Sequence, residues 1–192
     1  MTHGELTARL RELEATARVR GMRAKWMIGE PATAQAIDAC QSSLGFDFPA
    51  ALLEQVRQWD GFVVELYQQR EPGGDADPLR GSFQFLDTRL IAAWTLHVRK
   101  QLSTAMDDPR IADASRDPIS TMLFITYEDD IGAFVTASHK GPAEPEVRYV
   151  DMEYARDESP LELPVVATSL DDFIDKSLKH LADTLETPIY WW

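Results

Sequence analysis

The sequence predicts an α+β domain with a mostly antiparallel sheet, flanked by N-terminal helices and a C-terminal helix. Apolar residues recur every three or four positions up to about residue 59, which is the helical period. Short strand-like stretches then follow one another too closely for several parallel crossovers, so most neighbouring strands should pair antiparallel. The helical period returns near the C-terminal end. At 192 residues the chain has the length of one domain.

The N-terminal part predicts three helices. The first should end near Gly29-Glu30-Pro31. A second should run from about Ala32 to Leu44 and stop at Gly45, because glycine readily takes the left-handed conformation that ends many helices. The third should begin at Pro49, whose missing N–H costs nothing in a first turn, and end at Asp60-Gly61. The apolar stripe of the first helix is Leu6, Leu10, Leu13 and Ala17.

The remainder predicts a run of strands with one helix among them and one after them. The strand-like stretches are 62–67, 83–85, 122–127, 131–137, 147–154 and 161–166. The stretches 122–127 and 131–137 should form a tight antiparallel hairpin. Apolar steps of four predict a helix over 90–102, and residues 103–120 predict an irregular excursion. The closing helix should start at Ser169, whose hydroxyl can cap it while acidic residues occupy its first turn.

The charge is strongly negative and unevenly distributed. The chain has 32 acidic and 19 basic residues, for a net charge of −13. Residues 1–30 carry a net +2, whereas residues 128–175 carry thirteen acids against three bases. Such a field repels phosphate backbones and attracts basic surfaces, so we expect no nucleic-acid partner and favour a basic protein partner. The alternative interpretation is that the charge serves solubility alone.

Three absences narrow the class of protein. Cys40 is the single cysteine, so no internal disulfide can form. The N-terminal residues lack an apolar stretch of signal-peptide length, and no window approaches the ~18 apolar residues of a membrane span. We therefore expect a cytoplasmic protein without a membrane partner.

Three motifs in order resemble the SUKH superfamily, which joins a fungal cell-wall-synthesis regulator to many bacterial immunity proteins. The first is LGFDFPAALLEQVRQWDG, from Leu44 to Gly61. The second is LFITYEDDIGAFV, and the third is TSLDDFIDKSLKHL, from Thr168 to Leu181. The resemblance covers about residues 32–182. It implies a SUKH-like domain over 31–192 that is preceded by an N-terminal helical extension over 1–30, and residues 103–120 look inserted.

The resemblance implies binding rather than catalysis. We predict an immunity protein that neutralises a cognate toxin with a basic surface, such as a nuclease, and that is not itself an enzyme. A regulatory or scaffold protein with several intracellular partners is the alternative. A third hypothesis is a hydrolase that uses Glu128 and Asp130. The sequence lacks the serine-hydrolase, phosphate-loop and zinc-protease motifs, and it predicts no cofactor. It leaves the oligomeric state open.

The acidic run Glu128-Asp129-Asp130 is the most conspicuous candidate site. Its spacing does not fit a calcium loop, and adjacent turn carboxylates splay apart instead of flanking a substrate, so we predict neither a metal site nor a catalytic site. A solvated turn and an acidic rim that anchors a basic partner remain open. The predicted partner-binding residues are Glu128, Asp129, Asp130, Asp107, Asp108, Glu153, Asp157 and Glu158.

Two other features have ordinary structural interpretations. Cys40 lies beside Asp38 in a predicted helix, and a neighbouring carboxylate should raise the pKa of the thiol and make it a poor nucleophile. The aromatic end, Tyr190-Trp191-Trp192, could be an interface hot spot or dock onto the core. Docking is favoured, since exposed adjacent tryptophans invite aggregation.

Overall fold

The computed structural model describes residues 1–68, 79–106, 121–128, 131–136, 145–151 and 163–183. The predicted α+β class is confirmed, with helices on both sides of the strand run and two antiparallel sheets. The described helices are α1 (His3–Val19), α2 (Ala34–Leu44), α3 (Ala50–Gln58), α4 (Thr88–Met106) and α6 (Leu170–Asp183). Within these described ranges, no helix is long and apolar enough to cross a membrane.

The strands form one sheet of three and one of four. The first sheet has the order β1-β2-β3 and the second the order β4-β5-β6-β7, with neighbours antiparallel throughout. The predicted hairpin of β4 and β5 is confirmed by the pairing of Glu128 with Ile131. The strands are β1 (Met22–Ile28), β2 (Phe62–Gln68), β3 (Leu79–Phe85), β4 (Met122–Glu128), β5 (Ile131–Thr136), β6 (Val147–Asp151) and β7 (Val165–Ala167).

The prediction of one long N-terminal helix up to residue 29 is wrong. Helix α1 ends at Val19, and Gly21 has a φ of 71°, a left-handed conformation that glycine adopts without strain. Beyond it the apolar period changes from three or four to two, because Met22 and Ala24 are buried while Arg23 and Lys25 are exposed. The strand β1 then pairs with β2 over all seven of its residues.

Smaller differences concern the ends of other elements. Helix α4 continues to Met106 and so takes the first residues of the expected irregular stretch 103–120, while 107–120 lie outside the described residues. Strand β6 covers Val147–Asp151, and the expected strand residues 152–154 and 161–162 lie outside the described residues. Residues 163 and 164 are not in a strand, and β7 covers 165–167. Pro164 immediately precedes β7, consistent with the confinement of proline to strand ends.

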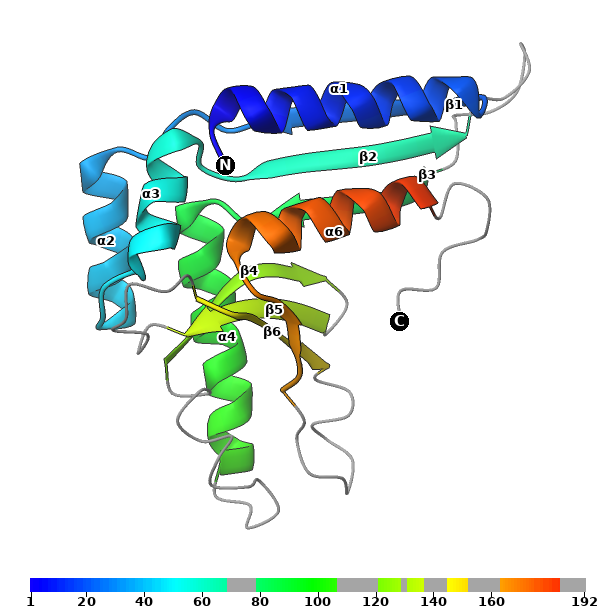
Figure 1. The fold of residues 1–192 in the computed structure, drawn as a ribbon. Coiled ribbons are helices and arrows are strands. Elements are labelled where there is room, and N and C mark those ends of the chain that lie inside the picture. The colour runs from blue at the N-terminus through cyan, green and yellow to red at the C-terminus, as the bar shows by residue number, and fades with distance from the viewer. Residues whose placement is uncertain (69–78, 107–120, 129–130, 137–144, 152–162, 184–192) are drawn as a thin grey trace.

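Helices α1 and α6 lie side by side on one face of the three-stranded sheet (Figure 1). Trp26, Val64 and Phe83 are aligned across the three strands, so their side chains share a face. The indole of Trp26 donates to Glu14 of α1 at 3.4 Å, and the Phe83 ring meets Phe173 of α6 edge-on at 5.9 Å. The apolar stripe predicted for the first helix is buried here, at 4% exposure or less.

Helix α4 packs against the second sheet. The hydroxyl of Thr95, which is fully buried, accepts a hydrogen bond from the Phe124 N–H of β4 at 3.1 Å. The Arg99 guanidinium donates to the carbonyl oxygens of Met122 and Leu44 and lies 4.3 Å from the centre of the Phe46 ring. Arg99 therefore ties α4 both to the start of β4 and to the end of α2.

The backbone just after β1, at Gly29 and Glu30, is in direct contact with the backbone of the Asp60-Gly61 turn. The Gly29 N–H donates to the Gly61 carbonyl at 2.8 Å, and the Asp60 N–H donates to the Glu30 carbonyl at 3.1 Å. A Cβ on Gly29 would lie 2.2 Å from the Asp60 carbonyl oxygen. Two backbones thus touch here without an intervening side chain, and only glycine fits at position 29.

Candidate functional site

The structure describes very little of the predicted acidic rim. Glu128 is the last residue of β4, and Ile131, its partner in the ladder, is the first residue of β5, so the hairpin frame is where the sequence placed it. The Glu128 side chain is outside the described part. The other predicted partner-binding residues are also outside it: Asp107, Asp108, Asp129, Asp130, Glu153, Asp157 and Glu158.

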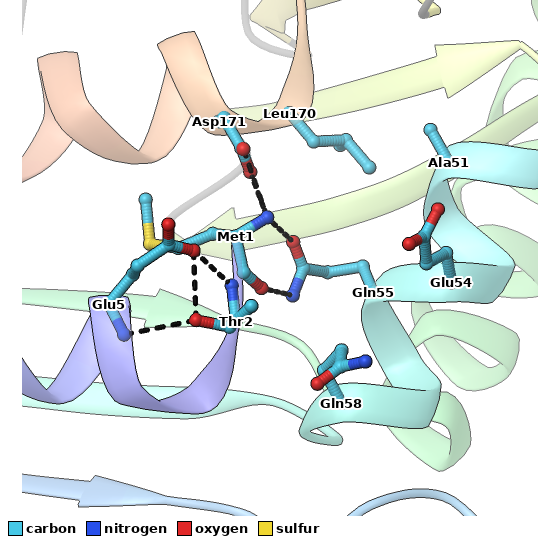
Figure 2. Close-up of a pocket in the computed structure, with 9 residues that line it drawn as sticks. All are labelled: Met1, Thr2, Glu5, Ala51, Glu54, Gln55, Gln58, Leu170 and Asp171. Atoms are coloured by element: carbon cyan, nitrogen blue, oxygen red, sulfur yellow. Dashed lines mark hydrogen bonds and ion pairs between the residues drawn. The ribbon is translucent and has the colours of Figure 1, made fainter.

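A groove between α1, α3 and α6 is a surface feature that the sequence analysis missed. One part of it, between the start of α1, α3 and the start of α6, is a cavity of about 250 Å³. Figure 2 shows the N-terminal end of α1 facing α3 on one side and the start of α6 on the other. Two further hollows of about 330 Å³ each continue it along α1 and α6. The residues that line the first cavity are Met1, Thr2, Glu5, Ala51, Glu54, Gln55, Gln58, Leu170 and Asp171.

Internal partners occupy most of the polar groups in this groove. The Met1 amino group donates to both carboxylate oxygens of Asp171, at 2.7 and 2.9 Å. The buried Gln55 amide donates to the Met1 carbonyl at 3.0 Å (Figure 2), and the Trp59 indole N–H also reaches that carbonyl, at 3.3 Å. Further along, Arg9 pairs with Asp175 at 3.0 Å. These bonds fasten α1 to α3 and α6.

Glu5 caps its own helix. The Thr2 hydroxyl accepts from the Glu5 N–H at 3.2 Å, and the Glu5 carboxylate accepts from the Thr2 N–H and hydroxyl at 2.7 and 2.9 Å. This reciprocal capping box satisfies donors that a helix start leaves open. The bonds from the Thr2 N–H and then from its hydroxyl lower the pKa of the Glu5 carboxyl. The spacing Thr2-x-x-Glu5 is the one signal of this groove that is visible in the sequence.

The groove is lined by more acidic than basic groups. Its walls carry five carboxylates, on Glu5, Glu12, Glu54, Asp171 and Asp175. The cationic groups are the Met1 amino group, Arg9 and Lys179. The Thr2 hydroxyl donates to the Glu5 carboxylate, but this pair forms the capping box of α1. Glu12 and Glu54 are exposed and form no ion pair with another described residue, so the acidic character of the chain extends to this side.

The Asp60-Gly61 motif has a structural role. The Asp60 carboxylate accepts from the Thr88 N–H at 2.7 Å and from the Thr88 hydroxyl at 2.9 Å, and so caps the start of α4. Burial raises the pKa of the Asp60 carboxyl, and the two bonds from Thr88 oppose this shift. Gly61 has a φ of 82°, and a Cβ there would lie 2.8 Å from the Asp87 nitrogen.

Cys40 is buried in α2, and its thiol is not poised as a nucleophile. The pKa of the thiol is raised to about 11, first by burial and then by the Asp60 carboxylate. The prediction that Asp38 raises the pKa of the thiol is wrong, because Asp38 is exposed on α2. The carboxylate that raises it is Asp60, which is distant in sequence and is brought near Cys40 by the fold. The predicted direction of the shift, a raised thiol pKa, is confirmed.

We predict that Cys40 will react very slowly with a thiol reagent in the native protein. With a pKa of about 11, about one thiol in a thousand is ionised at pH 8, and the sulfur is also buried. The native rate should therefore be at least about a hundredfold below the rate in denaturant. Stopped-flow labelling with a chromogenic disulfide at pH 8 measures both rates. Equal native and denatured rates would mean that α2 opens freely.

The described residues also bear on metals and histidines. Within them, no group of three or more histidine, cysteine, aspartate or glutamate side chains could hold a metal ion. His97 is exposed on α4 and meets the Trp94 ring edge-on at 5.5 Å. The Tyr190-Trp191-Trp192 end lies beyond the described residues, so its docking stays a prediction.

Comparison with known proteins places the chain in a family. None of the curated proteins compared with the chain matches it. The family model described as SMI1 / KNR4 family (SUKH-1) matches residues 31–176, about three quarters of the chain. The match begins after β1 and includes the Asp60-Gly61 turn, both sheets from β2 onward and the start of α6. The resemblance seen in the three sequence motifs is thereby confirmed, and the chain belongs to the SMI1/KNR4 family (SUKH-1).

Proposed function

We propose that this protein is an immunity protein that binds a cognate bacterial toxin and neutralises it by occlusion. The SMI1/KNR4 family includes toxin immunity proteins, and its members are generally non-enzymatic immunity or regulatory proteins. The family match is the observation that carries the proposal. The net charge of −13 supports it, because an acidic protein complements the basic cleft of a nuclease or another nucleic-acid-modifying toxin.

The proposed contact surface is the acidic stretch 128–175 together with Asp107 and Asp108. Residues 128–175 carry thirteen acids and three bases, and the eight carboxylates proposed for partner binding fall within this stretch or at 107–108. Charges at the rim of an interface mainly accelerate association, while buried aromatic and arginine contacts slow dissociation. The acidic surface would thus determine the association rate constant, and complementary apolar contacts would determine the lifetime of the complex.

The first experiment tests the function itself. The product of the gene adjacent to this one is the candidate toxin, and it should be co-purified with this protein and assayed with and without it. We expect a stable complex and loss of the toxin's activity on stoichiometric addition. Absence of both binding and protection would refute the immunity role, and binding to several unrelated cellular proteins would instead favour a regulatory or scaffold role.

The predicted rim can be tested by charge reversal. Changing Glu128, Asp129 and Asp130 together to lysine should lower the association rate constant about tenfold or more at low ionic strength, with little change in the dissociation rate constant. Stopped-flow fluorescence at several salt concentrations gives both constants. The effect should shrink as salt rises, since screening weakens steering between exposed charges.

A matched control separates a local rim from the overall charge. Glu30, Asp38 and Asp183 are exposed and lie on other parts of the chain. Their triple lysine variant changes the net charge by the same amount. We expect it to slow association clearly less than the rim variant does. If both triple variants slow association equally, the net field steers the partner and the three-residue rim is wrong.

A further inference from the structure

No helix of the described residues packs on the outer face of the three-stranded sheet, and this face has mixed chemistry. Helices α1 and α6 lie on the inner face, with Trp26, Val64 and Phe83. Alternation along the strands therefore turns the other set of side chains outward. Met27 is 67% exposed, and it is among the most exposed large apolar side chains of the described residues. The outward residues of β1 and β2 are Arg23, Lys25, Met27, Val63, Glu65 and Tyr67.

Lys25 and Glu65 lie opposite each other in the ladder, but they make no ion pair in the described structure. The Lys25 ammonium lies 4.7 Å from the centre of the Tyr67 ring instead. The Tyr67 hydroxyl donates to Glu65 at 2.6 Å, which holds both side chains in place. The face thus presents a positive and a negative group side by side, with an exposed apolar group, Met27, next to Val63.

The antiparallel register makes this face complementary to itself. Two sheets can pack face to face with their strands nearly aligned. Consider a two-fold axis that lies in the plane between the two sheets, parallel to the strands and above the line midway between β1 and β2. Each outward side chain of one copy then faces, on the other copy, the residue that is its own cross-strand neighbour. Lys25 then faces Glu65 of the second copy, and Met27 faces Val63 of the second copy. We propose that the outer face of β1 and β2 binds a second copy of this chain in this two-fold arrangement.

The charge distribution favours a second copy over other occupants. Contact between two copies through residues 128–175 would bring like charges together, because that stretch carries thirteen acids and three bases. This face has two bases and one acid among its six outward residues, so the like-charge repulsion is smaller here than at that acidic stretch. The overall charge of −13 disfavours nucleic acid as the ligand of the Lys25 and Tyr67 side chains.

The size of the face limits the strength of the association. The two strands β1 and β2, with seven residues each, cover roughly 23 Å by 10 Å, or about 230 Å² in projection. A standard interface buries about 800 Å² on each partner. The dimer should therefore form reversibly, with a dissociation constant that is micromolar or weaker. The inference does not depend on the proposed immunity function.

Charge-swap variants of the full chain provide the test. Sedimentation velocity from low micromolar to several hundred micromolar should show a concentration-dependent monomer–dimer equilibrium for the native sequence. Lys25→Glu and Glu65→Lys should each weaken dimerisation at least tenfold, because each places like charges opposite one another. An equimolar mixture of the two variants should associate again, since the carboxylate introduced at position 25 of one variant then faces the ammonium introduced at position 65 of the other.

The mixing experiment protects the result against a trivial cause. A variant that had merely lost its fold could not regain association by mixing, and circular dichroism checks the fold of each variant directly. Lys179→Glu on the exposed side of α6 is the matched control and should leave the equilibrium unchanged. The proposal is overturned if the native chain stays monomeric over the whole range, if the single variants dimerise like it, or if the mixture stays monomeric.

Discussion

Removal of residues 1–28 is expected to abolish cooperative folding of the remaining chain. Although the family match begins at residue 31, β1 is a strand of the first sheet and α1 packs on that sheet. Without them, Val64 and Leu66 of β2, which are fully buried, would be exposed along with the unpaired edge of β2. Burial of each leucine of α1 contributes about 1.5–3 kcal/mol. Three such leucines approach the net stability of about 5–15 kcal/mol that is typical of a domain.

Urea titration followed by far-ultraviolet circular dichroism measures this effect. The shortened chain should show no sigmoidal transition, whereas the full chain should unfold in a cooperative one. A single substitution provides a graded version: Leu10→Ala should cost about 2–5 kcal/mol, and Arg11→Ala, on the exposed side of the same helix, should change stability by less than about 0.5 kcal/mol. If the shortened chain unfolds as cooperatively as the full chain, residues 1–30 are a separable extension of a domain over 31–192.

Gly29→Ala is expected to destabilise the protein by about 3 kcal/mol or more. The added methyl group would lie 2.2 Å from the Asp60 carbonyl oxygen and 2.9 Å from its carbonyl carbon. Both are backbone atoms, so no side-chain rotation can relieve the overlap. The change must instead separate β1 from the Asp60-Gly61 turn and break the Gly29–Gly61 and Asp60–Glu30 hydrogen bonds.

Gly4→Ala is the matched control. Gly4 lies in the first turn of α1, and an added Cβ would meet nothing within 4 Å. Alanine favours the helix, so this variant should be unchanged or more stable by up to about 1 kcal/mol. The free energies of unfolding of both variants come from the same denaturant titration. A loss below about 1 kcal/mol for Gly29→Ala would show that the turn can move aside and that the close backbone approach is not essential.

Local patterns were sufficient for much of the fold. Helix α6 follows from its apolar stripe and from the Ser169 hydroxyl, which accepts from the Asp172 N–H at 3.0 Å. Helix α2 ends at Gly45 in a left-handed conformation, as its sequence predicts. The β4–β5 hairpin likewise follows from two apolar runs with a short polar link. In each case the determining contacts lie within a few residues in the chain, which is why the sequence pattern reveals them.

The first helix shows where local patterns were insufficient. Its stripe is correctly predicted as far as Ala17, but β1 is stable as a strand because Met22 to Ile28 pair with Gln68 to Phe62, some forty residues further along. The groove could not be predicted either, because its walls come from α1, α3 and α6, which are far apart in the sequence. The proximity of Asp60 to Cys40 was missed for the same reason. The acidic rim was chosen from the chain alone, and it stays a prediction.

The sequence by itself determined the α+β class, the family and the acidic character of this protein, because composition, apolar periodicity and motif order are properties of the chain. The tertiary structure decided that residues 22–28 are a strand, that Gly29 must be glycine, and that Lys25 lies beside Glu65 on the outer face of the first sheet. These features depend on contacts between segments far apart in the chain. Such contacts form and stabilise the protein only in the folded chain, so they cannot be predicted from a pattern of neighbouring residues.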